Sequence, residues 1–188
     1  MLRQIILVSM LLFSLPSFAQ LAAKLDAANI DAALGRSGTW TGGVYVVDFF
    51  RPELKVRLDG VLLAPESTES FLTFEPVGKQ AEVMGEVSAL QSEVTAVVRE
   101  LRAGGIQITG IHNHFLEESP HLMFIHFMGH GQPVELARTF RAALATTKTP
   151  LDRVPAPRQV TAAPAWANTL ENTWGFKQTL NIPRTTAA

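Results

Sequence analysis

Apolar residues recur along this chain with two spacings, one typical of helices and one typical of strands. Spacings of three and four residues predict three helices, which are Leu25 to Leu34, Gln91 to Ala103, and a last helix that starts near Pro133. The turn signal Asp59-Gly60 predicts a β-hairpin. Short β-branched and alternating runs predict the strands Val44 to Phe50, Lys55 to Leu58, Val61 to Leu63, Phe71 to Phe74, Ala81 to Val87, Ile106 to Phe115 and Leu122 to Met128.

From Ala81 onward, the order of the predicted elements is strand, helix, strand, strand, helix. The first three elements predict a right-handed crossover unit, and the two strands after the helix predict a hairpin. This order is the skeleton of a ferredoxin-like layer. We therefore expect an α+β fold with a ferredoxin-like β-α-β-β-α layer, extended by N-terminal β-hairpin strands.

The two ends of the chain differ from its middle. Residues 1–19 have a basic start, an apolar run from Ile5 to Leu15 and a small-residue cleavage site, which predicts a secretory signal peptide. We expect residues 20–149 to form the folded domain and residues 150–188 to form a proline-rich linker and a C-terminal tail. A cleaved signal peptide would place the mature protein in the periplasm or outside the cell.

Composition narrows the classes of function. The formal net charge of −1 gives no electrostatic case for binding nucleic acid. The absence of cysteine excludes disulfides, thiolate metal sites and a cysteine nucleophile. Outside the predicted signal peptide, no apolar run is long enough to span a bilayer, so we expect no stable membrane insertion after cleavage.

All five histidines fall between His112 and His130, a concentration that composition alone does not explain. Side chains two apart on a strand point to the same face. We therefore expect His112 and His114 to share a face with Ile106 and Ile108.

The turn after this strand brings in further candidates. A five-residue loop from Glu117 to His121 would set His112 opposite His126. The same register would set His114 opposite Phe124. The metal ligands predicted from this arrangement are three histidines and a loop carboxylate, namely His112, His114, His126 and Glu118.

The remaining histidines and the identity of the metal are less constrained. His130 is a further candidate ligand, although its position fits equally well with support of another ligand or with no role at the site. His121 is expected to be a turn residue. Imidazole and carboxylate donors favour zinc first, and they also suit nickel, iron(II) and manganese. Met84, Met123 and Met128 leave copper open as well, because thioether and imidazole together suit it.

The sequence His112-x-His114-x3-Glu118 resembles the first half of the cupin metal motif. The second cupin motif is missing, and the predicted helices argue against an all-β barrel.

A fuller resemblance, from about Leu25 to Thr149, is to the LppY/LpqO family of exported proteins, a domain of unknown function. It implies the same site residues, together with Asn113 and Pro120. Relatives often carry two such domains in tandem, which implies a homodimer here if the site needs two copies. The matching segments are Ala33-Leu34-Gly35-Arg36-Ser37-Gly38, Gly42-Gly43-Val44-Tyr45, Val83-Met84-Gly85-Glu86, Ile111-His112-Asn113-His114-Phe115-Leu116-Glu117-Glu118-Ser119-Pro120 and Phe124-Ile125-His126-Phe127.

Three functional hypotheses follow from these observations. The first is a zinc-dependent periplasmic hydrolase that acts on a small-molecule or envelope substrate, with Glu118 or Glu117 as general base. The second is a non-catalytic periplasmic carrier or sensor that binds zinc or copper. The third is a structural domain whose histidines bond only one another.

Overall fold

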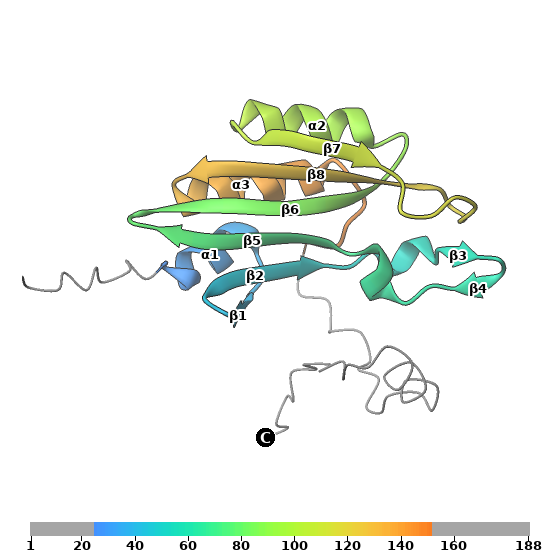
Figure 1. The fold of residues 1–188 in the computed structure, drawn as a ribbon, viewed down its shortest axis with the longest axis horizontal. Helices are drawn as coiled ribbons and strands as arrows, with labels where there is room; N and C mark the ends of the chain where they lie inside the picture. The colour runs from blue at the N-terminus through green and yellow to red at the C-terminus, as the bar shows by residue number, and fades with distance from the viewer. Residues whose placement is uncertain (1–24, 152–188) are drawn as a thin grey trace, which may run out of the picture.

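The computed structural model describes residues 25–151, which form one mixed sheet-and-helix unit (Figure 1). The predicted signal peptide and most of the predicted linker and tail lie outside these residues. The elements are α1 (Ala27–Leu34), β1 (Thr39–Thr41), β2 (Val44–Phe49), η1 (Pro52–Leu54), β3 (Arg57–Leu58), β4 (Val61–Leu62), η2 (Pro65–Thr68), β5 (Ser70–Val77), β6 (Gln80–Leu90), α2 (Val94–Ala103), β7 (Gln107–His112), β8 (Leu122–Gly131) and α3 (Pro133–Ala145).

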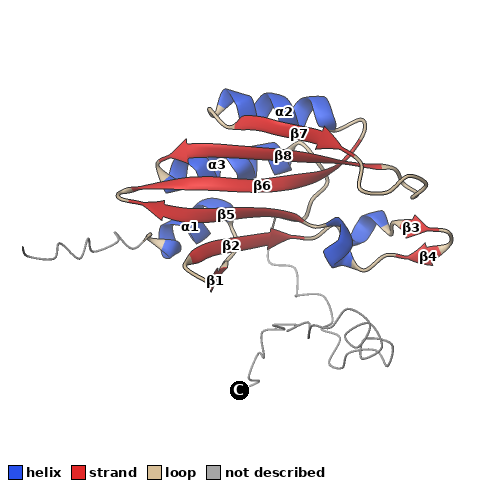
Figure 2. Cartoon of the chain, viewed as in Figure 1, coloured by secondary structure: helices blue, strands red, loops and turns tan. Residues whose placement is uncertain are grey.

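Six strands form one antiparallel sheet in the order β1-β2-β5-β6-β8-β7. The three helices lie together on one side of this sheet, and no described helix lies on the other side (Figure 2). The short strands β3 and β4 pair with each other in a separate hairpin beyond the end of the main sheet (Figure 1). The sheet therefore has one helix-covered face and one face without described helices, here called the open face. At one end of the open face, Leu122 and Phe124 of β8 are buried in a second, smaller apolar cluster with Val56.

The alternation of residues on each strand determines which side chains enter the core. On β6, Val83 and Val87 are fully buried in the main apolar cluster, which also contains Phe140 from α3. Residues of the opposite parity, such as Met84 and Glu86, therefore point to the open face. β6 is a central strand, so this face extends over both β5 and β8.

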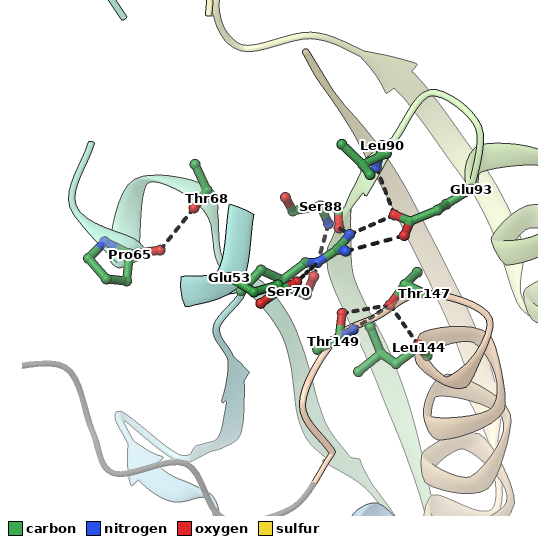
Figure 3. A network of polar contacts seen from close by, with 11 residues as sticks. Glu53, Pro65, Thr68, Ser70, Ser88, Leu90, Glu93, Leu144, Thr147 and Thr149 are labelled. Atoms are coloured by element: carbon green, nitrogen blue, oxygen red, sulfur yellow. Dashed lines mark hydrogen bonds and ion pairs between the residues drawn. The ribbon is translucent and has the colours of Figure 1, made fainter. Parts of the chain in front are cut away.

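A buried ion pair fixes the sheet to α2. The Arg51 side chain is fully buried, and its Nη1 lies 2.6 Å from an oxygen of Glu93, the residue before α2. Glu93 also accepts a hydrogen bond from the backbone N–H of Leu90, at the end of β6 (Figure 3). The approach of Arg51 lowers the pKa of Glu93, although burial acts against it. Neither residue was singled out from the sequence.

The predicted α+β class is confirmed, as are the Asp59-Gly60 hairpin and the three helices, although α2 begins at Val94 and not at Gln91. The ferredoxin-like layout is not confirmed. Strand β8 does lie between β6 and β7, but the other neighbour of β6 is β5, which precedes it in the chain. Within residues 25–151, no helix is long and apolar enough to cross a membrane.

Candidate metal centre

Strand β8 places His126 on the open face of the sheet. Its neighbours Ile125 and Phe127 are buried in the core on the helix-covered side. Because successive side chains alternate, the imidazole of His126 points the other way. The partner of His126 on β6 is Glu86, which therefore shares this face.

A β-bulge in β7 brings His112 to the same face. Ile108 pairs with Phe127 on β8, whereas Gly110 pairs with the adjacent residue His126, so Thr109 is an extra residue without a partner in the ladder. The extra residue reverses the parity of the rest of β7. The prediction that His112 shares a face with Ile106 and Ile108 is therefore wrong, because both isoleucines pack against the helix-side core.

The predicted hairpin register is also wrong. His112 pairs with Phe124, and not with His126, and β7 ends at His112. The connection to β8 is therefore nine residues long, from Asn113 to His121, and not five. Against the predicted register, this is a shift of two residues. A shift of two preserves the face, so the histidines still converge.

Hydrogen bonds hold the connection in its nine-residue form. The backbone N–H groups of Arg57 and Ser119 each donate to the carbonyl of the other residue, at 2.9 and 2.8 Å. The side-chain amide of Asn113 donates to the carbonyl of Phe115. The Asn113 bond occupies a carbonyl that a longer β7 would use in its ladder with β8, and the bonds between Arg57 and Ser119 tie the connection to β3.

Three imidazoles meet where β7 ends. His112, His114 and His126 each offer one ring nitrogen, and the three nitrogens lie within 4.8 Å of one another. The rings of His112 and His126 stack with centroids 4.7 Å apart. The ring of His114 stacks on Phe124 with centroids 3.6 Å apart, which fixes its orientation although it lies beyond the end of β7. This spacing is close enough to hold a metal ion.

The structure places the other predicted residues away from this trio. Glu118 is buried in the loop, where its Oε1 accepts a hydrogen bond from the Leu122 N–H at 2.9 Å and lies 3.0 Å from His121 Nδ1. Glu117 is exposed on the same loop. His130 lies further along β8, with its Nε2 2.7 Å from Oε1 of Gln80. His121 is a loop residue, as predicted.

Glu86 is the carboxylate that the structure brings to the trio. Its Oε2 lies 3.5 Å from Nε2 of His126 and 3.9 Å from Nε2 of His114. Sequence analysis named Glu86 only within a segment that matches the LppY/LpqO family and gave it no role at the site, because it is 26 residues before His112. The alternation of buried valines around it was the available signal, since that places Glu86 on the face opposite the core.

Burial controls the protonation of this group of side chains. It lowers the pKa of His126, and the charge of His112 lowers it further. Burial, His112 and then His126 lower the pKa of His114 in the same way. Burial also raises the pKa of Glu86, against a smaller opposing effect of His112. The neutral forms of His114 and His126 are therefore favoured at neutral pH, and neutral imidazole is the form that binds metals.

Two half-buried carboxylates lie near Glu86. Asp48 is on β2 and pairs with Phe71, which in turn pairs with Glu86. Glu69 follows η2, and burial together with the charges of Asp48, Glu66 and Glu86 raises its pKa to about 7. The open face therefore carries acidic groups beside its histidines.

The described residues thus form an α+β protein with a three-histidine cluster on the open face of its sheet. The chain belongs to the family described as Domain of Unknown Function (DUF1259), whose profile matches residues 28–146. No curated protein and no solved structure matched the chain.

Proposed function

We propose that this chain is an exported metal-binding protein in which His112, His114 and His126 hold a divalent transition metal ion. The observation that carries the proposal is the approach of three ring nitrogens to within 4.8 Å of one another. A second feature supports it. The Nε2 atom of His126 is buried and has no hydrogen-bond partner among residues 25–151. Such an atom is costly to bury, and a metal ion would satisfy it.

Zinc is the metal that this donor set favours first. Neutral imidazoles bind zinc at about 2.0–2.1 Å, and three protein ligands are common in zinc sites. Nickel, iron(II) and manganese accept the same donors. Copper has separate support, because Met84 and Met128 pair across β6 and β8 on the open face, beside Glu86 and His126.

Metal binding without catalysis is the role that the geometry supports best. The hydrolase hypothesis used Glu118 or Glu117 as general base, but Glu118 is hydrogen-bonded within the loop and Glu117 is exposed there. Hydrolysis stays a second candidate, because His112 and His114 are exposed and a substrate could reach the site. In that case the metal would supply Lewis-acid activation of water.

The setting of the protein is part of the proposal. The predicted signal peptide would direct the chain to the periplasm or outside the cell, where a carrier or sensor for a metal would meet its ion. The resemblance to the LppY/LpqO family, whose members are exported proteins, agrees with this setting. The homodimer implied by tandem-domain relatives also stays a prediction.

Metal analysis of the full chain, purified without a polyhistidine tag, tests the proposal. We expect close to one equivalent of metal per chain after reconstitution with zinc, and loss of that metal in His112→Ala and His126→Ala. His121→Ala is the matched control, since its ring faces Glu118 in the loop. No binding of zinc, copper, nickel or iron by the wild-type chain would refute the proposal. Equal loss in all three variants would show that the trio is not the site.

A further inference from the structure

The carboxylate of Glu86 occupies a place that only the folded sheet creates. Glu86 lies on the central strand β6, between Phe71 of β5 and His126 of β8. Cross-strand partners on one face have Cβ atoms about 4.5–5.5 Å apart. Glu86 is therefore held beside His126 by backbone pairing on both sides of its own strand.

The distances from Glu86 match those between two ligands of one ion. A single atom, Oε2, lies 3.5 Å from Nε2 of His126 and 3.9 Å from Nε2 of His114. Two ligands in a tetrahedral zinc site, with bonds of about 2.0–2.1 Å, are about 3.3 Å apart. These two distances need to shorten by only a few tenths of an ångström, whereas the three histidine nitrogens, which lie within 4.8 Å of one another, need to move further to enclose one ion with Glu86.

Glu86 also lacks a fixed cation. The residue is only 9% exposed, and its ion-pair contacts within residues 25–151 are to His114 and His126 alone. A buried carboxylate that has no cationic partner is costly, whereas a bound divalent ion would compensate it. Glu118 differs in position, because its Oε1 is held by a backbone N–H and by His121 within the loop; its Oε2 is buried without a hydrogen-bond partner among residues 25–151, but it is not part of the group of close donor atoms at the trio.

We infer that Glu86, and not Glu118, is the fourth protein ligand of the metal site, completing a three-histidine, one-glutamate set with His112, His114 and His126. The inference rests on the proposed metal-binding function and adds a ligand to it. With a four-coordinate ion such as zinc, all four ligands come from the protein, which favours retention of the metal over hydrolysis. An ion that takes six ligands would keep open positions.

The test compares Glu86→Gln with Glu118→Gln, a matched loss of charge at another buried glutamate. Zinc affinity of the full chain is measured by competition with a chromophoric chelator. We expect Glu86→Gln to weaken zinc binding by more than about 100-fold, beyond the 10- to 100-fold typical of a residue that only supports a ligand. Glu118→Gln should stay within about threefold of wild type. Equal affinities for Glu86→Gln and wild type would overturn the inference, as would a larger effect of Glu118→Gln.

A second measurement uses the wild-type chain and does not depend on the folding of a variant. In a crystal structure of the zinc-loaded protein, we expect an oxygen of Glu86 at about 2.0–2.2 Å from the metal. A metal bound by the three histidines without Glu86 would overturn this inference and leave the proposed function intact. A wild-type chain that binds no metal would instead remove the proposed function itself.

Discussion

The two faces of the six-stranded sheet are built from the same strands but differ in chemistry. On the helix-covered face, β6 and β8 contribute Val83, Val87, Ile125 and Phe127 to one apolar cluster. On the open face, the alternate positions of β6 and β8 carry Glu86, His126 and the exposed Met84 and Met128. Leu122 and Phe124 lie on this face as well, buried in a second, smaller apolar cluster with Val56. The alternation of a strand thus separates the site residues from the main apolar cluster, although the open face has a small core of its own beside the site.

This separation has a consequence for substitutions. A change on the helix-covered face should alter the free energy of unfolding and leave the ligands in place. A change at a site residue of the open face should alter metal binding or pH dependence and leave the metal-free fold nearly as stable, whereas Leu122 and Phe124 on that face are core residues. Adjacent residues of one strand therefore provide matched pairs that test the comparison.

The largest effect is expected from Phe127→Ala on β8. Phe127 is 2% exposed, and its ring centroid lies 5.4 Å from that of Phe140 in α3. Its truncation leaves a cavity between sheet and helix, and we expect a loss of about 3–5 kcal/mol in the free energy of unfolding. Urea denaturation of the metal-free protein measures this loss.

The control for Phe127→Ala is its neighbour, His126→Ala. His126 faces away from the core, and its removal also removes a buried nitrogen without a hydrogen-bond partner among the described residues. We expect the metal-free stability of His126→Ala to lie within about 1 kcal/mol of wild type. A loss as large as that of Phe127→Ala would show that His126 itself serves as a core residue.

A smaller effect is expected from the pair Val83→Thr and Met84→Thr on β6. Val83 is fully buried, so its replacement places a hydroxyl in the apolar cluster and should cost about 1–3 kcal/mol. Met84 is 59% exposed on the other face, and threonine suits a strand, so its replacement should change stability by less than about 0.5 kcal/mol. Thermal unfolding of the two variants measures the difference, and equal destabilisation would contradict the assignment of faces.

The sequence predicted part of this arrangement because some of its signals are local. The alternation around His126 and the spacing of His112 and His114 pointed to one shared patch, and the structure brings these three together. The bulge at Thr109 reverses the parity of β7, and the prediction of an uninterrupted strand overlooked Gly110 beside it, a residue type that often marks a bulge. The histidines still meet because the actual register differs from the predicted one by two residues, which preserves the face.

The identity of the nearby carboxylate depended on a non-local contact. Glu118 was chosen because it is close in sequence, but a loop residue can bond its own loop, as Glu118 does with Leu122 and His121. Glu86 reaches the trio through the pairing of β6 with β8 across the inserted helix α2. Sequence patterns describe which face a strand residue takes, but they do not give the order of strands in the sheet.

The smallest effect is expected from the acidic part of the open face, where Glu69→Gln should stabilise the protein at high pH only. Burial and neighbouring carboxylates raise the pKa of Glu69 from 4.5 to about 7 in the folded protein. As the pH rises from 4.5 to 7, the unfolded chain loses this proton first, so the wild type loses stability over that window and Glu69→Gln does not. The whole shift would correspond to about 3 kcal/mol, which partial exposure to water reduces to about 1 kcal/mol.

Urea denaturation at about pH 4 and pH 8 should therefore show a gain of about 1 kcal/mol for Glu69→Gln over wild type that develops only at the higher pH. Glu117→Gln, at an exposed loop position, should show no such change between the two pH values. A difference between Glu69→Gln and wild type that is the same at both pH values would mean that neither burial nor the neighbouring carboxylates raise the pKa of Glu69.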